Sequence, residues 1–314
     1  SPLARGEYPG TPRNDNMKRF DPASLPIAEL HAHLVGAVGP RPVAFASTID
    51  AEGRPNLSPF SFFNVFGANP PICIFSPARR GRDNTTKDTY HNVKAVPEVV
   101  INVVTYAMVN QTSLASTEYP SGVNEFEKAG FTAIVSEKVR PFRVKESPVQ
   151  FECLVKQVIE TGSGGGAGNL VICEIVMIHI DEAVLNEHGR IDQRKIDLVG
   201  RMGGHFYVRA HGDALFELPQ PAKEIGIGVD ALPKDVREST ILTGNDLGRL
   251  GASLSLPDET SVNEHKLTAL SDLFIQLQSR PEDLRTTLHQ HAQRLLREGK
   301  VSEALMTLLA YNDR

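Results

Sequence analysis

Small hydroxyl, amide and aromatic side chains alternate in one short part of this chain. Residues 56–64 read Asn-Leu-Ser-Pro-Phe-Ser-Phe-Phe-Asn, so Ser58, Ser61 and Asn64 recur at every third position with phenylalanines between them. A buried core strand would be rich in Val, Ile and Leu throughout. Buried polar groups need hydrogen-bond partners, and a ligand with a polar rim would supply them. An exposed edge strand with aromatic anchors is the alternative interpretation.

A cationic loop follows this segment. It holds Arg79, Arg80, Arg82 and Lys87, and it ends at the hydroxyl of Thr89. Such a cluster alone is typical of a solvated surface loop. Beside a pocket, however, guanidinium and ammonium groups are good donors to a phosphate. The two segments together indicate a planar, polar-edged aromatic ligand that carries a phosphate, and a flavin is the obvious candidate.

Other patterns that could carry chemistry have simpler interpretations. The glycine-rich run 162–168 leads into a strand-like sequence and not into a helix, so a hairpin connection is favoured over a phosphate loop. His31 and His33 would share one face of a strand, but no further ligands lie nearby in sequence, so we predict no metal site. His205 follows two glycines that allow a ligand to approach closely, which makes it a candidate functional residue.

Composition and charge argue against several classes of protein. The 314 residues carry a net charge of −5, without the basic excess typical of nucleic-acid binding. No apolar run reaches the roughly 18–20 residues of a membrane helix, and no signal-peptide pattern is present, so we expect a cytoplasmic protein. Cys73, Cys153 and Cys173 each lie in an apolar run and are expected to be buried, reduced thiols.

Short strands are the elements that must position these residues. Residues 1–23 are predicted to form an N-terminal arm, 24–216 a strand-dominated domain, and 217–314 a mostly helical C-terminal extension. Many short strands with one or two helices favour a closed antiparallel barrel over a doubly wound sheet. The expected strands are 43–48, 72–76, 99–105, 149–160 and 170–184, and the expected helices are 106–116, 263–280 and 281–299.

Four segments in the right order resemble one known family. They are Gly-Pro-Arg-Pro-Val-Ala-Phe-Ala-Ser-Thr (39–48), the segment 56–64, Lys-Asp-Thr-Tyr-His-Asn (87–92) and Gly-Gly-His-Phe-Tyr (203–207). They look like the flavin reductase-like proteins, which include flavoredoxins and the reductase components of two-component monooxygenases. The resemblance covers roughly residues 25–210. It implies a mainly β fold, an FMN-binding split β-barrel of six strands, here with a C-terminal helical extension, in a homodimer with flavin near the subunit interface.

The resemblance also implies a function and a set of site residues. The function is a flavoprotein oxidoreductase (a flavin reductase) that binds FMN, or alternatively FAD, and passes hydride from NADH or NADPH to the flavin, with a monooxygenase as a candidate partner. The catalytic candidates are His205 and Arg41. The candidate cofactor-binding residues are Ser47, Thr48, Ser58, Pro59, Phe60, Ser61, Phe62, Phe63, Asn64, Arg82, Lys87 and Thr89. The alternatives are an FMN enzyme acting on another small organic substrate, a non-catalytic flavin-binding electron carrier, and a structural barrel without flavin.

Overall fold

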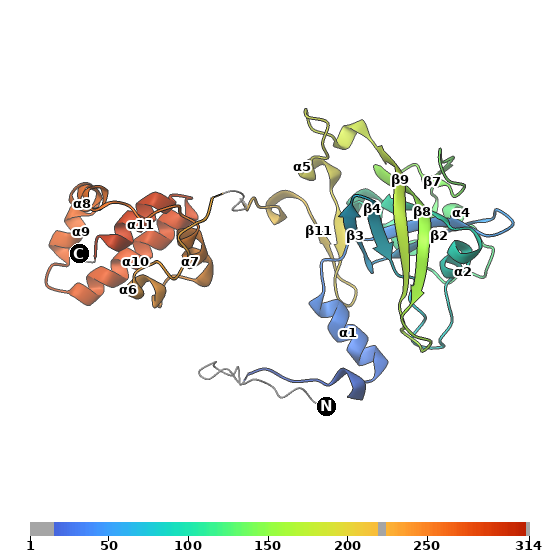
Figure 1. Cartoon of the computed structure of the whole chain (residues 1–314), viewed down its shortest axis with the longest axis horizontal. Helices are drawn as coiled ribbons and strands as arrows, with labels where there is room; N and C mark the ends of the chain where they lie inside the picture. Colours follow the sequence, from blue (N-terminus) through green and yellow to red (C-terminus); the bar gives the residue numbers. More distant parts are fainter. Residues whose placement is uncertain (1–15, 219–223, 312–314) are drawn as a thin grey trace. The chain divides into compact units, whose positions relative to one another are not determined.

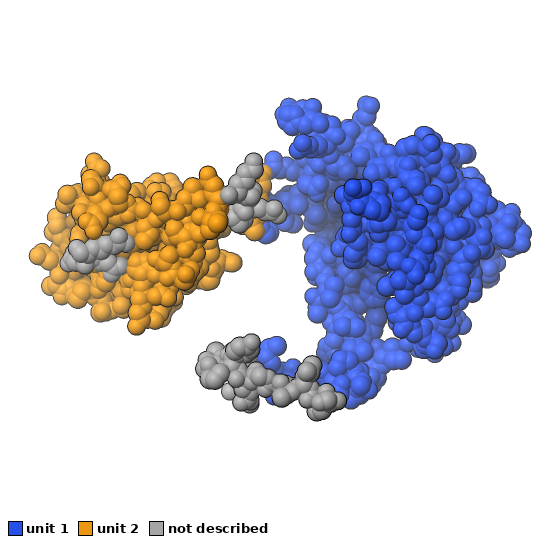
Figure 2. Space-filling model, in the orientation of Figure 1, with its two compact units in different colours: residues 1–216 blue, residues 217–314 orange. Residues whose placement is uncertain are grey.

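The chain divides into two compact units, residues 1–216 and residues 217–314 (Figures 1 and 2). The computed structural model describes residues 16–218 and 224–311. Most of the predicted N-terminal arm lies outside the described residues; from Asn16 to Ala23 the chain is exposed. Each unit has its own hydrophobic core and is described by itself below.

Unit 1 is built on a seven-stranded antiparallel sheet with the strand order β2-β1-β5-β8-β9-β4-β3. The strands are β1 (Ala44–Ile49), β2 (Pro55–Phe60), β3 (Phe63–Ala68), β4 (Pro71–Phe75), β5 (Glu98–Val103), β8 (Val149–Glu160) and β9 (Asn169–Ile180). The two edge strands, β2 and β3, are joined by the two-residue turn Ser61–Phe62. The sheet must therefore curl until its edges meet at this turn, although the edges do not pair as a ladder. The result is a barrel that is split between β2 and β3.

Shorter elements surround this sheet. The helices are α1 (Ile27–Ala37), α2 (Asp88–Ala95), α3 (Val109–Leu114), α4 (Glu125–Ala129) and α5 (Gln193–Ile196), with 3-10 turns η1 (Pro22–Ser24), η2 (Tyr106–Met108), η3 (Glu182–Val184) and η4 (Gly212–Ala214). Two small antiparallel pairs join β6 (Ala133–Ile134) to β7 (Arg143–Val144) and β10 (Val199–Arg201) to β11 (Tyr207–Arg209).

The sequence of β1 is apolar or small throughout because both faces of this strand are buried. Phe45 packs into one cluster with Leu57 and Phe126, whereas Ala44 and Ala46 point to the opposite cluster, as alternation along a strand requires. The second cluster also contains the three cysteines, which are free and buried as predicted. The glycine-rich run 162–168 connects β8 to β9, which confirms the predicted hairpin.

Two local predictions for unit 1 are wrong, and a third is only partly right. Residues 27–37 form helix α1, where His31 and His33, two residues apart, do not share a face. Helix α2 falls where no helix was predicted. The expected helix 106–116 begins as the 3-10 turn η2 and becomes α3 only at Val109. Among the described residues no group of three or more His, Cys, Asp or Glu side chains could hold a metal ion.

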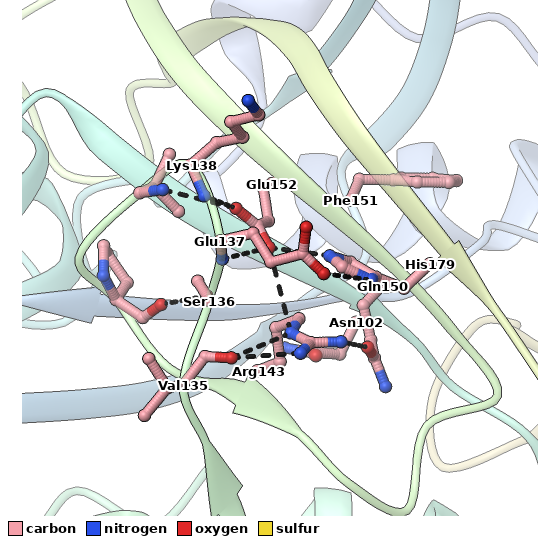
Figure 3. A network of polar contacts seen from close by, with 12 residues as sticks. Asn102, Val135, Ser136, Glu137, Lys138, Arg143, Gln150, Phe151, Glu152 and His179 are labelled. Atoms are coloured by element: carbon pink, nitrogen blue, oxygen red, sulfur yellow. Dashed lines mark hydrogen bonds and ion pairs between the residues drawn. The ribbon is translucent and has the colours of Figure 1, made fainter.

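A buried carboxylate holds the segment between β6 and β7 against the sheet (Figure 3). Glu152 of β8 has no exposed surface, and it accepts hydrogen bonds from the backbone N–H groups of Glu137 (2.9 Å) and Lys138 (2.5 Å). The Nε2 atom of His179 lies 2.7 Å from the same carboxylate, and the Arg143 guanidinium 3.8 Å away. Burial by itself raises the pKa of Glu152, but these hydrogen bonds outweigh it and hold the pKa below its usual value.

Unit 2 is helical, as predicted. It comprises α6 (Lys234–Arg237), α7 (Gly244–Gly251), α8 (Glu259–Thr268), α9 (Ser271–Gln276), α10 (Pro281–Arg297) and α11 (Val301–Leu309). The predicted helix 281–299 corresponds to α10: Pro281 occupies its first turn, and Gly299 follows its end with a positive φ of 79°. The predicted helix 263–280 is divided into α8 and α9. In the described part of the chain no helix is long and apolar enough to cross a membrane.

Candidate functional site

A cavity of about 240 Å³ opens beside the first turn of α2. Strand β2, the cationic loop, α2, the segment after α3 and the start of α4 all contribute to its wall. The residues that line it are Asn56, Ser58, Arg80, Thr86, Lys87, Asp88, Thr89, Ala115, Ser116, Thr117, Glu118, Tyr119, Ser121 and Glu125. The wall is therefore mostly polar and carries both cations and carboxylates.

The N-terminus of α2 provides donors for an anion. Lys87 is the N-cap residue, and no side chain caps the backbone N–H groups of the first turn. Such groups carry partial positive charge and favour an anion. Within the described residues the Lys87 ammonium has no recorded hydrogen bond or ion pair, and burial, followed by the neighbouring Arg80, lowers its pKa. A half-buried ammonium at an uncapped helix N-terminus is a good phosphate site.

Arg80 adds a second cation to the same wall. Its Nη1 atom donates to Oγ1 of Thr85 (2.9 Å) and to the carbonyl of Thr86 (2.8 Å), and its Nε atom lies 2.9 Å from Oε1 of Glu118. The Glu118 carboxylate also accepts from Arg82. Arg80 therefore faces the cavity, whereas Arg82 is largely exposed and does not line it.

The floor of the cavity is a buried polar network. Asn56 donates through Nδ2 to both carboxylate oxygens of Glu125 (3.2 and 3.3 Å), and its Oδ1 atom accepts from Thr89 (2.9 Å) and Thr48 (3.4 Å). The backbone N–H of Leu57 donates to Glu125 as well (3.0 Å). Burial raises the pKa of Glu125, and these hydrogen bonds partly oppose the rise. The network ties β1, β2, α2 and α4 together, so that the polar residues at the start of the 56–64 segment find their partners within the protein.

The β8–β9 hairpin supports the cationic loop from behind. The N–H of Arg79 donates to the carbonyl of Ala167 (2.9 Å), and the N–H of Gly166 donates to the carbonyl of Arg79 (3.1 Å). A Cβ atom at Gly165 would lie 3.0 Å from the carbonyl oxygen of Gly81, closer than side chains normally approach. Glycine is needed here so that the two backbones can lie against each other.

The structure separates the predicted cofactor-binding residues from one another. Ser58, Lys87 and Thr89 line the cavity. Thr48 lies in the network beneath it. Ser47 is fully buried, and its Oγ atom has no hydrogen-bond partner in the described structure. Neither Ser47 nor Thr48 lines this cavity.

The 56–64 segment is a hairpin and not a single strand, which separates its residues. Phe60 is buried in the core, with its ring centroid 5.5 Å from that of Phe75, so this side chain packs against protein instead of facing the cavity. Phe62 is exposed at the turn, 6.2 Å from the ring of His31. Of the other residues in this segment, Pro59, Ser61 and Phe63 are half-buried and Asn64 is exposed.

The two catalytic candidates lie apart from this cavity. Arg41 is buried and donates to the carbonyls of Val35 (2.7 Å), Val38 and Met202 (3.1 Å), so its guanidinium closes the C-terminal end of α1. His205 lies exposed in the turn between β10 and β11.

Sequence reasoning also missed several residues that line the cavity. Arg80 was visible in the cationic cluster, but Glu118 and Glu125 come from a later segment and carry no local signal.

Comparison with known proteins identifies the family. The family model described as "Flavin reductase like domain" matches residues 38–196, which is half of the chain. The chain belongs to this flavin reductase-like family. An uncharacterized protein of Aquifex aeolicus is 36% identical over 184 residues, which cover 59% of this chain and 91% of that protein. The match of the family model ends before unit 2 begins.

Solved structures agree with this assignment. Nitrilotriacetate monooxygenase component B from Bacillus cereus has a TM-score of 0.60 at 30% identity, covering 64% of this chain and 98% of that one. The 2-nitrobenzoate 2-nitroreductase of Pseudomonas fluorescens has a TM-score of 0.57 at 25% identity, covering 64% and 96%. The expected fold, a split barrel with C-terminal helices, is confirmed, although the main sheet has seven strands and not the six that the resemblance implied.

Proposed function

We propose that this protein is an FMN-binding oxidoreductase of the flavin reductase type. The observation that carries the proposal is the cavity at the start of α2. It combines an uncapped helix N-terminus, the ammonium of Lys87 and the guanidinium of Arg80, and it lies in a barrel of the flavin reductase-like family. These groups suit the phosphate of FMN, which riboflavin lacks.

Each group has a definite task in this proposal. Lys87, Arg80 and the first N–H groups of α2 bind the phosphate, and Ser58 hydrogen-bonds the chain that leads away from it. The ring then lies toward the β2–β3 turn, where Phe62 is exposed. The carboxylate of Glu118 accepts hydrogen bonds from Arg80 and Arg82. Some of these hydrogen bonds have to break when a phosphate binds to the same guanidinium groups. Three candidates do not contact the flavin in this proposal and instead support the wall by packing behind it: Ser47, Thr48 and Phe60.

The bound flavin would supply the acceptor for hydride from NADH or NADPH. The protein would align the nicotinamide ring with the flavin ring and exclude water. These tasks require side chains that position the rings and no acid–base pair. Arg41 is a positioning residue in this proposal, because it fixes α1 and the backbone of Met202 near the β10–β11 turn. His205, in that turn, remains the candidate for orienting the nicotinamide.

A homodimer completes the proposal. Helix α1 has no buried residue and extends away from the sheet (Figure 1). Its Leu34 and Val38 are 54% and 63% exposed, and Val65 and Phe66 of the edge strand β3 are 52% and 65% exposed. Apolar side chains exposed in this number on an edge strand and a helix are typical of an interface.

The decisive experiment is an absorbance spectrum of the purified protein with FMN, followed by anaerobic titration with NADH and with NADPH. We expect the spectrum of a bound flavin, and its bleaching by at least one of the two nicotinamides at a rate fast enough for turnover. A protein that stays colourless with excess FMN would refute the proposal. A yellow protein that neither nicotinamide reduces would instead be an electron carrier.

A second candidate function is the reduction of a small organic substrate. The structural likeness to 2-nitrobenzoate 2-nitroreductase favours it. Stopped-flow reoxidation of the reduced protein by nitroaromatic compounds, compared with reoxidation by oxygen, separates the two functions. Faster reoxidation by the organic compound indicates a substrate-specific reductase.

A further inference from the structure

Unit 2 contains a cavity of its own. Its volume is about 160 Å³, and it lies between the first half of α10 and the segment that contains α6 and the turn after it. A single water needs roughly 10–15 Å³ of such space, so the cavity has room for a small ligand. His289, Ser239 and Arg285 are among the residues that line it.

The hydrogen bonds around Ser239 determine where the His289 imidazole carries its proton. The Ser239 Oγ atom accepts from the N–H groups of Ile241 (3.2 Å) and Leu242 (3.1 Å). Its own hydrogen is therefore available for the Nδ1 atom of His289, which lies 2.7 Å away. A neutral imidazole that accepts at Nδ1 carries its hydrogen on Nε2. Burial lowers the pKa of His289, which favours this neutral form.

The Nε2–H group is a buried donor without a partner. His289 is 3% exposed, and its Nε2 atom has no hydrogen-bond partner in the described structure. A buried donor left unpaired is costly, and proteins pair nearly all of them. Since His289 lines the cavity, the missing acceptor belongs to whatever occupies it.

The other walls restrict the chemistry of that occupant. Arg285 lies one helical turn before His289 on α10, so two donor groups stand on the same side. The carboxyl groups of Asp235 and Glu238 line the cavity as well. An anion alone would be repelled by these carboxylates, and a cation alone would leave the Nε2–H group of His289 without an acceptor. Arg285 donates through Nη2 to Glu282 (2.5 Å), and its guanidinium has further N–H groups to offer. A molecule that carries both charges offers an acceptor to His289 and Arg285 and a cation to the carboxylates.

We propose that this cavity binds a small zwitterion of the α-amino-acid class. Its carboxylate accepts hydrogen bonds from Nε2 of His289 and from Arg285, and its ammonium group interacts with Asp235 and Glu238. The proposal concerns unit 2 alone and does not rest on flavin binding.

Calorimetric titration of the full chain with the individual common α-amino acids tests this site. We expect at least one of them to bind, and we expect His289→Phe and Arg285→Gln each to weaken its binding by about tenfold or more. His291→Phe is the matched control, because it removes an imidazole from the same helix outside the cavity, and it should bind within about twofold of the unaltered protein.

NMR of the histidine imidazoles in the unaltered full chain tests the same site without any substitution. The Nε2–H signal of His289 should be visible and should shift when the amino acid is added. If no amino acid shifts this signal at millimolar concentration, or if His289→Phe folds and binds like the unaltered protein, the proposal is wrong. It is also wrong if a crystal grown with the amino acid shows only a water joining Nε2 to the opposite wall.

Discussion

At the scale of single residues, the site depends on which cations face the cavity. The sequence placed Arg79, Arg80, Arg82 and Lys87 in one cluster but could not distinguish them, because orientation comes from contacts made by distant segments. Glu118 turns Arg80 toward the wall of the cavity, and it lies 38 residues away along the chain. Lys87 was named as a candidate from the cationic loop and the motif 87–92, but its place at the N-terminus of α2 was not predicted.

Replacing Lys87 tests the anion site directly. Lys87→Met should weaken FMN binding by about 10- to 100-fold, since a charge-assisted hydrogen bond contributes roughly 1.5–3 kcal/mol. Flavin fluorescence quenching gives the dissociation constant. Lys94→Met is the matched control on the same helix: its ammonium pairs with Glu160 outside the cavity, and FMN binding should be unchanged. Equal affinities of Lys87→Met and the unaltered protein would place the phosphate elsewhere.

Replacing Glu152 tests the buried network of Figure 3. Glu152→Gln should lower the free energy of unfolding by about 2–4 kcal/mol, because backbone donors and His179 lose a charged acceptor. The pKa of Glu152 is depressed in the fold, so its stabilisation is fully present above the unfolded value of about 4.3 and is lost as pH falls through the folded pKa.

Urea denaturation at several pH values between neutral and acid measures both effects. The unaltered protein should lose stability in the acid range more steeply than Glu152→Gln does. Glu187→Gln, at an exposed position, should leave stability and its pH dependence unchanged. Parallel pH curves for Glu152→Gln and the unaltered protein would contradict this account.

At the scale of elements, the strands were predictable and the first helix was not. Runs of Val, Ile and Phe bounded by turn residues gave β4, β5 and β8 within one or two residues of the observed ends. Helix α1 buries none of its residues, and the segment was instead considered as part of a strand-dominated region. The turn at Ser61–Phe62 was missed because it contains neither Gly nor Asn, and a strand was expected to continue through it.

The β8–β9 hairpin should influence flavin binding although it does not line the cavity. Gly165→Ala places a Cβ atom against the carbonyls of Gly81 and Arg80, so the cationic loop has to shift. We expect several-fold weaker FMN binding with little change in the thermal midpoint. Gly164→Ala is the control, since nothing lies within 4 Å of its Cβ position. If both variants bind FMN alike, the hairpin does not position the loop.

At the scale of the whole molecule, the proposed homodimer should depend on β3. Phe66→Glu adds a charge to an exposed apolar edge strand and should convert a dimer to monomers, as measured by light scattering after size exclusion. Val135→Glu is the control, because Val135 is 74% exposed on another part of unit 1. A protein that is monomeric without any substitution, or dimeric with Phe66→Glu, would remove β3 from the interface.

The sequence could predict the family, but not the walls of the cavity. The motifs at 39–48 and 56–64 indicated a flavin reductase-like barrel, and the family match supports that interpretation. The sequence could not show that Asn56 is satisfied by Glu125, a residue 69 positions later, or that Phe60 points into the core. Contacts of this kind arise from the closure of the barrel and leave no local pattern.

The most direct test of the central claim compares FMN with riboflavin, which differs only in lacking the phosphate. If Lys87, Arg80 and the start of α2 bind that phosphate, the unaltered protein should bind FMN at least about 100-fold more tightly than riboflavin, since two or more charge-assisted hydrogen bonds depend on it. The ratio should fall sharply in Lys87→Met. Equal affinity of the unaltered protein for FMN and riboflavin would contradict the assignment of this cavity.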